Sequence, residues 1–318
     1  MASVMRPILG PSEGTRHRGV KDPAERLPFH PAMCGIAGYF ALEARPLPGR
    51  EVLERMVDAV RHRGPDDSGV YLDARAALGH RRLSIIDLSG GRQPLGTADR
   101  ALWVTFNGEI FNYIELREAL AKRGHVFRTK TDTEAILHGY AEHGPACVER
   151  FNGDFAYALW DRRRERLVLA RDRMGVRPLY YTVRNGALVF ASEIKALLLY
   201  PGVRAALDPL ALDQGFTFWA PLAPRTAFKD ILEVPPGNQL IAENRSVRVQ
   251  PYWRLRFPSR NERGSVNEAE AAEEVEALLD DATRIRLRAD VPVGSYLSGG
   301  FDSSATTALA RRHNGDNL

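Results

Sequence analysis

The chain has 318 residues, of which 44% are hydrophobic and 26% are charged, proportions that are ordinary for a globular protein of about two domains. Its formal net charge is only +4, from 44 basic and 40 acidic residues spread along the sequence, so we expect no nucleic-acid partner. No apolar run approaches the length of a membrane span, so we also expect no membrane partner.

The first 32 residues precede a segment, MCGIAGYF, that itself reads like the start of a protein. They are rich in Pro, Gly and charged residues and lack the apolar stretch of a secretory signal, so we expect residues 1–33 to be a disordered leader or a misassigned start. The two cysteines, Cys34 and Cys147, provide neither a disulfide framework nor a CxxC metal site. They favour a reducing compartment, which we interpret as the cytoplasm.

Short apolar segments dominate residues 34–200, where they alternate with polar residues or run continuously between turn signals. The strand candidates are CGIAGYF (34–40), ALWVTFN (101–107), FAYALWD (155–161), RLVLARD (166–172) and ALVFAS (187–192). Helices are predicted over residues 50–61 and 133–143, the second with Thr131 or Asp132 as its cap. Many strands with two helices predict an α+β domain of stacked sheet and helix layers.

Residues 201–264 are expected to form a mixed connector, because APLAP, VPPGN and QPYW interrupt any single periodic element. From Asn267 the sequence NEAEAAEEVEALLDDATRIRLRAD predicts an amphipathic helix whose acidic start and basic end suit the helix dipole. VPVGSYL then predicts a buried strand, SGGFDSS a loop and ATTALARR another helix. Residues 265–318 therefore predict the opening of an α/β domain.

The segment SGGFDSS combines a glycine-rich turn with the start of a helix, an arrangement whose backbone N–H groups and positive dipole favour phosphate. Gly299 and Gly300 allow close approach of the backbone, the serine hydroxyls add donors, and Asp302 could hold a magnesium ion. A Ser/Gly turn that only caps a helix is the alternative. The Walker pattern GxxxxGK[ST] is absent, and the string resembles the pyrophosphate-binding PP-loop of ATP pyrophosphatases.

Cys34 directly follows a methionine. If Met33 starts the chain and is removed, or a propeptide is cleaved, the Cys34 thiol lies beside a free α-amino group. That amine has a reference pKa of roughly 7.7–8.0, so it can act as a general base at neutral pH. A lone cysteine is usually a small core residue, which is our interpretation of Cys147 in GPACVER.

Eight further motifs occur in the order seen in class II glutamine amidotransferases. They are MCGIAGYF, RHRGPDDSG, GHRRLSIID, FNGEIFN, TKTDTEAI, NGDFAYALWD, RDRMGVRPLYY and FASEIKAL. With the PP-loop they make the chain resemble the glutamine-hydrolysing asparagine synthetase family over residues 33–312. The resemblance implies an N-terminal-nucleophile sandwich of stacked antiparallel sheets between helices (34–200), followed by the beginning of an α/β PP-loop ATP pyrophosphatase domain (265–318).

For the first domain, the resemblance implies that Cys34 attacks the glutamine side-chain amide, forms a glutamyl thioester and releases ammonia. Asn107 and the backbone N–H of Gly108 would stabilise the oxyanion. Taken alone, Asn107-Gly108 reads equally well as a hairpin turn.

The resemblance also implies that Arg82 binds the substrate α-carboxylate, whereas Glu109 and Asp132 accept from its α-amino group. Their simpler interpretations are a surface charge for Arg82 and a helix cap for Asp132. The expected glutamine-binding residues are Arg82, Leu83, Ser84, Ile85, Ile86, Asn107, Gly108, Glu109 and Asp132.

For the second domain, the resemblance implies that ATP, with magnesium, activates the β-carboxylate of aspartate as an acyl adenylate that ammonia attacks. The expected ATP-binding residues are Tyr296, Leu297, Ser298, Gly299, Gly300, Asp302 and Ser303, with Asp302 also helping to bind magnesium. The family continues for some hundreds of residues beyond the PP-loop, so we expect this chain to be an N-terminal fragment of a longer synthetase. A homodimer is compatible with the resemblance.

Two other hypotheses stay open. One is an amidotransferase of the same family that delivers ammonia to a different carboxylate, because the acceptor site would lie beyond Leu318. The other is a non-catalytic regulatory module, which an internal Cys34 would favour and the intact NGE, RLSII and TDTE segments disfavour.

Overall fold

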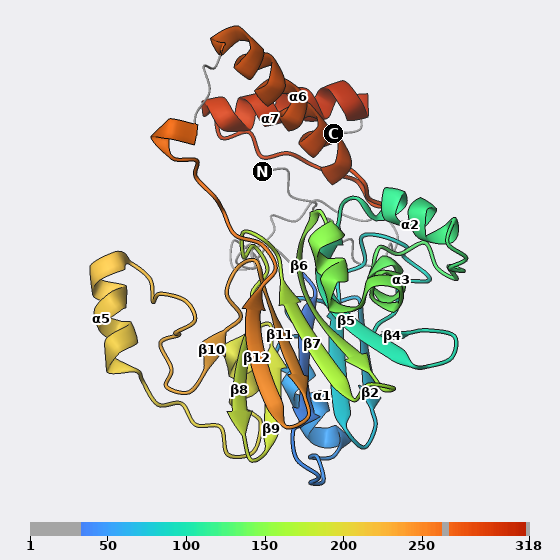
Figure 1. The fold of residues 1–318 in the computed structure, drawn as a ribbon, viewed down its shortest axis with the longest axis vertical. Coiled ribbons are helices and arrows are strands. Elements are labelled where there is room, and N and C mark those ends of the chain that lie inside the picture. Colours follow the sequence, from blue (N-terminus) through green and yellow to red (C-terminus); the bar gives the residue numbers. More distant parts are fainter. Residues whose placement is uncertain (1–32, 263–266, 316–318) are drawn as a thin grey trace, which may run out of the picture. The chain divides into compact units, whose positions relative to one another are not determined.

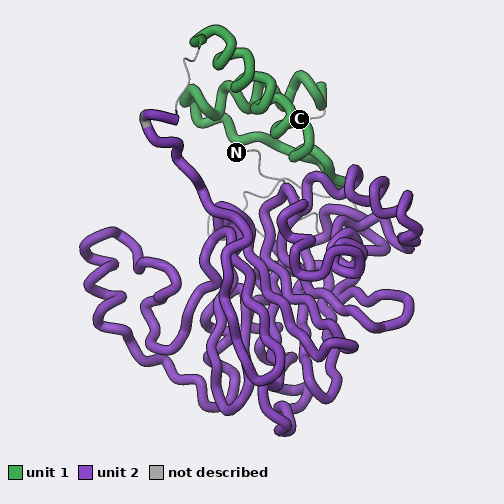
Figure 2. Tube along the Cα trace, in the orientation of Figure 1, with its two compact units in different colours: residues 1–32, 265–318 green, residues 33–264 purple. Residues whose placement is uncertain are grey.

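The computed structural model describes residues 33–262 and 267–315 (Figure 1). It divides into two compact units, one spanning Met33–Gly264 and one containing the C-terminal residues 265–318 (Figure 2). The predicted leader lies outside the described residues, apart from Met33. Within the described ranges, no helix has both the length and the apolar character that crossing a bilayer requires.

The larger unit is built on two six-stranded sheets in which all the neighbouring strands run antiparallel. The first has the order β10 (Leu232–Glu233), β8 (Tyr180–Arg184), β9 (Ala187–Ala191), β1 (Gly35–Ala41), β3 (Ala76–Arg82), β2 (Asp67–Leu72). The second has the order β12 (Ser246–Pro251), β11 (Asn238–Glu243), β7 (Arg166–Arg171), β6 (Gly153–Asp161), β5 (Leu102–Ile110), β4 (Leu95–Gly96).

The two sheets stack face to face, and helices cover both outer faces (Figure 1). Successive side chains of β1 point to opposite faces of its sheet. Ile36 and Phe40 enter the core between the sheets, whereas Ala37 and Tyr39 pack toward the helices. Helices α1 (Arg50–Asp58) and α4 (Ile194–Leu197) cover the first sheet, and α3 (Thr133–His143) with the 3-10 helix η2 (Gly144–Arg150) covers the second. The predicted antiparallel sandwich between helices is therefore confirmed.

All five strand candidates and both predicted helices between residues 34 and 200 are present, and α1 ends slightly earlier than expected, at Asp58. Helix α2 (Tyr113–Ala121) was not predicted from the sequence, nor were several strands, including β2 and β3. Strand β2 is only partly buried, and the apolar face of β3 is interrupted by His80 and Arg82, so neither has the alternation of a typical strand. Cys147 is fully buried in η2, as expected of a core residue.

The expected connector, residues 201–264, is more ordered than its sequence suggests. Helix α5 (Pro209–Phe218) begins with a Pro after an Asp208 cap, and β11 pairs with β7 over Gln239–Ala242. Because β11 contributes the fully buried Leu240 and Ala242 to the core between the sheets, the sandwich continues into this segment.

In the smaller unit, α6 (Glu268–Arg286) starts at Asn267, whose side chain accepts from Ala269 N at 3.0 Å, as the amphipathic pattern predicts. Helix α7 (Phe301–Asn314) packs on α6, and His313 Nε2 lies 2.9 Å from Asp280 Oδ1. Two expectations fail here. VPVGSYL contains only a single β-bridge residue, Gly294, and no described strand pairs along it. The loop after it is shorter than SGGFDSS, since α7 already begins at Phe301.

The contribution of β11 to the core can be measured. Leu240→Ala should lower the free energy of unfolding by about 2–5 kcal/mol, because it leaves a cavity between the sheets. Val249→Ala on the paired strand β12 is the matched control, since Val249 is 38% exposed and lies opposite Leu240. Urea unfolding of residues 33–264 provides both values, and equal small losses would show that β11 is not part of the core.

Candidate active site

The position of Cys34 follows from the register of β1. Gly35 pairs with Arg81 of β3, so the preceding residue lies beside the chain that continues from β3. Leu83 N donates to the Cys34 thiol at 3.3 Å, and the thiol donates to Leu83 O at 3.6 Å. Arg63 Nε donates to Cys34 O at 3.0 Å and holds this end of the strand.

Burial raises the pKa of the Cys34 thiol to about 11, against the lowering effects of the Leu83 hydrogen bond and of the nearby guanidinium groups of Arg177 and Arg82. The thiol is therefore almost entirely protonated at neutral pH. A nucleophilic role for Cys34 requires a base that removes this proton.

A pocket opens beside Cys34. It is lined by Met33, Cys34, Arg82, Leu83, Ile85, Ile86, Gly91, Gln93, Phe106, Asn107, Gly108, Glu109, Thr131, Asp132, Thr133 and Arg177. Of the residues expected to bind glutamine, only Ser84 is absent from this lining. Its backbone N–H instead donates to Asp66 Oδ2 at 2.8 Å, which fixes the turn after β3.

Asn107, from β5, brings an unsatisfied amide to this pocket. The residue is fully buried, and neither its Nδ2 nor its Oδ1 has a hydrogen-bond partner among the described residues. Buried amides are nearly always paired, so an unpaired one that lines a pocket indicates a group reserved for a ligand.

Gly108 continues the same strand with a φ of 146°, and a Cβ there would lie 2.0 Å from Asp154 O, so only glycine fits. On either side of it, Phe106 N donates to Gln93 Oε1 at 2.7 Å and Ile110 N donates to Asp132 Oδ2 at 2.9 Å. Strand alternation therefore directs the N–H of Gly108 toward the same edge, on the pocket side. Asn107 Nδ2 and Gly108 N–H can thus act together on one oxygen atom.

Arg82 ends β3 with its guanidinium held by backbone carbonyls. Nη1 donates to Leu88 O at 3.2 Å, and Nη2 donates to Ile86 O at 3.2 Å and Asp87 O at 2.6 Å. Of the five N–H donors of an arginine, two are left for a ligand within the described structure. The side chain is 6% exposed, which excludes the interpretation of Arg82 as a surface charge.

Asp132 precedes α3 in the N-cap position, but its side chain makes no capping hydrogen bond. Thr131 Oγ1 instead accepts from Thr133 N at 3.3 Å, while Asp132 Oδ2 accepts from Ile110 N. Burial raises the pKa of Asp132 to about 6, although hydrogen bonds from Ile110 and Thr131 act in the opposite direction. Glu109 is likewise buried and lines the same pocket, which therefore contains two acidic residues.

Sequence reasoning missed several pocket residues. Gln93 bridges Phe106 N and Thr133 Oγ1, and Arg177 contacts both Met33 Sδ and, at 3.4 Å, Asp154 O. Arg177 lies in the motif RDRMGVRPLYY and could have been singled out there, whereas Gln93 lies in GGRQPL, which carries no recognisable pattern.

In the smaller unit, the predicted phosphate loop lies at the N-terminus of α7. Gly299 has a φ of 84°, and Gly300 is the N-cap with no side-chain capping bond, so the first-turn N–H groups stay available. The Ser298 and Ser303 hydroxyls lie 2.9 Å apart. Ser303 Oγ also lies 3.0 Å from Gly300 O, and Tyr296 and Leu297 are largely exposed, so phosphate binding at this loop stays a prediction. Within the described ranges, no three His, Cys, Asp or Glu side chains cluster as a metal site would, so magnesium at Asp302 stays a prediction.

Comparisons with known proteins agree with these two units. Residues 33–253 match the family model of the glutamine amidotransferase domain, and residues 274–318 match that of asparagine synthase. The allosteric regulatory enzyme of purine biosynthesis is structurally similar, with a TM-score of 0.51 and 20% identity over 69% of this chain and 49% of that one. At this identity the likeness shows the fold alone.

The stacked antiparallel sheets and the pocket beside Cys34 fit a glutamine amidotransferase domain. The chain belongs to the glutamine amidotransferase domain family.

Among curated relatives, asparagine synthetase [glutamine-hydrolyzing] 3 of Bacillus subtilis is 38% identical over 284 residues, which are 88% of this chain and 46% of that protein. Amidase chyE of Penicillium rubens is 36% identical over 290 residues, which are 87% of this chain and 42% of that protein. The chain thus spans about half the length of the curated relatives that it matches.

Proposed function

We propose that this chain carries the glutaminase site and the beginning of the synthetase domain of a glutamine-hydrolysing asparagine synthetase. The observation that carries the proposal is the buried, unpaired amide of Asn107 in the pocket of Cys34. The family match and the similarity to asparagine synthetase 3 of B. subtilis support it.

The proposed reaction starts with a form of the protein whose first residue is Cys34. Its free α-amine takes the thiol proton, because the raised pKa of the thiol leaves little thiolate at neutral pH. The sulfur then adds to the side-chain amide carbon of glutamine, and Asn107 and Gly108 donate to the oxyanion. The C–N bond breaks, the amine returns the proton to the departing ammonia, and water later hydrolyses the thioester to glutamate.

Substrate recognition uses both charges of the amino-acid head group. The two remaining N–H donors of Arg82 would bind the α-carboxylate, and Asp132 with Glu109 would accept from the α-ammonium group. Burial makes these contacts stronger than they would be at the surface.

In the second unit, Ser298, Gly299, Gly300 and Ser303 would hold the phosphates of ATP, and Asp302 would help to bind magnesium. ATP would supply the activation of the aspartate β-carboxylate, which ammonia then converts to an amide. The alternative is an amidotransferase of the same family with a different acceptor carboxylate, and one relative is named an amidase and not an asparagine synthetase. We place the protein in the cytoplasm, where Cys34 stays reduced; a homodimer stays a prediction.

The glutaminase assignment predicts activity without ATP. Protein expressed from Met33, with that methionine removed, should release glutamate from glutamine, whereas its Cys34→Ala variant should release none above background. Cys147→Ala should retain most of the activity, because Cys147 is buried in η2 and does not line the pocket. Coupled glutamate detection provides the measurement. Equal activity in a protein shown by N-terminal sequencing to retain Met1 would contradict the role of the α-amine.

Substitutions at Asn107 and at Arg82, which would bind opposite ends of glutamine, should change different kinetic constants. Asn107→Ala should lower kcat by roughly 10²–10³-fold with little change in KM, because the oxyanion forms only after attack. Arg82→Ala should mainly raise the KM for glutamine, because its contact exists in the ground state. Steady-state kinetics decide between these roles, and losses confined to KM in both variants would contradict the assignment of Asn107.

The pKa of Asp132 predicts a pH dependence of binding. The ionised carboxylate binds the α-ammonium group, so as pH falls through about 6, Asp132 becomes protonated and the KM for glutamine should rise, by up to about tenfold per pH unit. In Asp132→Asn, KM should be high and insensitive to pH between 5 and 7. A wild-type KM that stays constant over this range would show that Asp132 does not bind the ammonium group as a carboxylate.

A further inference from the structure

We propose that Asp87 is a positioning residue that fixes the separation between Arg82 and Asp132, the two ends of the glutamine head-group site. The inference rests on the proposed function, since it concerns how that site holds an α-amino acid. Asp87 does not line the pocket, so its role would act through these two residues.

The backbone of Asp87 holds the Arg82 guanidinium. Its carbonyl oxygen accepts from Arg82 Nη2 at 2.6 Å and from Gly91 N at 3.0 Å. The residue has a φ of 52°, in the left-handed region that Asp and Asn tolerate better than other non-glycine residues. This backbone turn directs the carbonyl toward the guanidinium.

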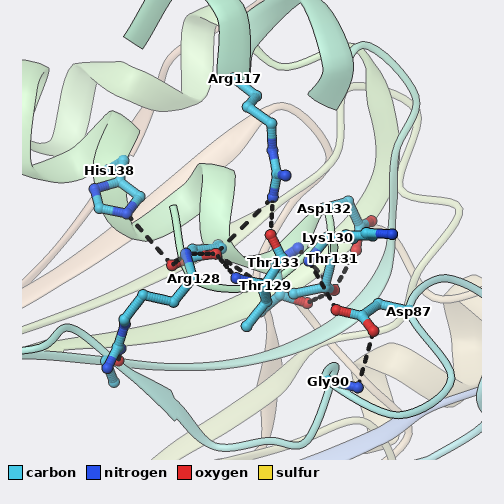
Figure 3. Close-up of polar contacts among 12 residues, drawn as sticks. Asp87, Gly90, Arg117, Arg128, Thr129, Lys130, Thr131, Asp132, Thr133 and His138 are labelled. Carbon is cyan, nitrogen blue, oxygen red and sulfur yellow. Dashed lines mark hydrogen bonds and ion pairs between the residues drawn. The ribbon is translucent and has the colours of Figure 1, made fainter. Parts of the chain in front are cut away.

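The side chain of Asp87 holds the segment that leads to Asp132. Asp87 Oδ2 accepts from Lys130 N at 2.8 Å, and Oδ1 accepts from Gly90 N at 2.8 Å (Figure 3). Lys130 lies two residues before Asp132, so this bond fixes the segment that presents the Asp132 carboxylate. Asp87, which is buried, therefore bonds both to Arg82, which would bind the substrate α-carboxylate, and to the segment that carries Asp132, which would bind the α-ammonium group.

Two glycines leave room for this arrangement. A Cβ at Gly90 would lie 2.5 Å from Asp87 Oδ2, and a Cβ at Gly91 would lie 2.3 Å from Arg82 Nη2. The loop after β3 can close over both charged groups only because these positions lack side chains.

Glu134 anchors the other end of the 128–132 segment. Its carboxylate accepts from the backbone N–H groups of Arg128 and Thr129 and from Thr129 Oγ1 (Figure 3). His138 Nε2 lies 3.5 Å from Glu134 Oε1. Burial alone would raise the pKa of Glu134, but the hydrogen bonds from His138, Thr129 and Arg128 lower it to about 2. Glu134 bonds this segment to its own helix, α3. Asp87 bonds the segment to the loop after β3, whose carbonyl oxygens hold the Arg82 guanidinium.

Asp87→Asn tests the coupling, because Asn keeps the shape and tolerates the same φ. It has one acceptor oxygen for two N–H donors, so either Lys130 N or Gly90 N would face an NH₂ group. The KM for glutamine should rise about tenfold, while kcat stays within about twofold, because the bonds of Asp87 described above lead to Arg82, Gly90, Gly91 and Lys130, which make contacts with the substrate head group or support them.

The matched control is Asp161→Asn. Asp161 is also buried and accepts from two backbone N–H groups of a turn, Arg163 N at 3.0 Å and Arg164 N at 3.1 Å, but does not line the pocket. Both variants should be compared by thermal unfolding. If Asp87→Asn does not fold, Gly90→Ala, which crowds the Asp87 carboxylate, should give the same selective rise in KM.

A substrate analogue separates positioning from general stability. 4-Carbamoylbutanoate retains the amide and the carboxylate but lacks the α-amino group, so it cannot use Asp132. Asp87→Asn should therefore impair use of this analogue by only about two- to threefold. An unchanged KM for glutamine, a loss confined to kcat, or equal losses for both substrates would overturn the role of Asp87.

The wild-type protein distinguishes this inference from the proposed function. If wild-type protein with Cys34 at its N-terminus releases no glutamate, the proposed function fails. If it does release glutamate and Asp87→Asn has the same KM, only the positioning role fails.

Discussion

The register of β1 between β3 and β9 is the constraint on which the site depends. Every residue of β1 is buried, and at Gly38 a Cβ would lie 2.2 Å from Ala77 O and 2.5 Å from the Phe190 ring. A one-residue slip would move Ile36 and Phe40 onto the helix-covered face of the sheet. It would also place a side chain at the position of Gly38, where only glycine fits. Because the register is fixed, Cys34 is held opposite the end of β3, next to the backbone of Leu83 and the side chain of Arg82.

The pocket brings together buried polar groups that a ligand could satisfy. In the described structure, both polar atoms of the Asn107 amide are buried without partners, and burial raises the pKa of Asp132 to about 6. Each unsatisfied buried donor or acceptor costs about 1–3 kcal/mol. A ligand with an amide and two head-group charges would satisfy these groups, so polar groups that destabilise the empty site would favour the bound one.

The sequence predicted those parts of the molecule in which local pattern and tertiary environment agree. Strands β5, β6 and β7 have continuous or alternating apolar residues, and the order of the motifs anticipated that Cys34, Arg82 and Asn107 would share one pocket. Asp132 shows the opposite case, since its position before α3 is typical of a cap, yet its side chain bonds Ile110 N across the site. A local pattern cannot distinguish these two uses of one carboxylate.

Gln93 and Asp87 were missed for a related reason. Their roles consist of bonds to backbone atoms that lie far away in the sequence, such as Phe106 N and Lys130 N, and backbone acceptors and donors leave no trace in the identity of the partner residue. The same reasoning explains why VPVGSYL is no strand in the described structure while the Gly299 turn forms nonetheless. A strand requires a neighbouring strand that hydrogen-bonds along it, whereas a left-handed glycine before a helix requires only its own φ and ψ. The turn at the predicted phosphate loop is thus encoded locally, whereas a strand also depends on partners from other segments of the chain.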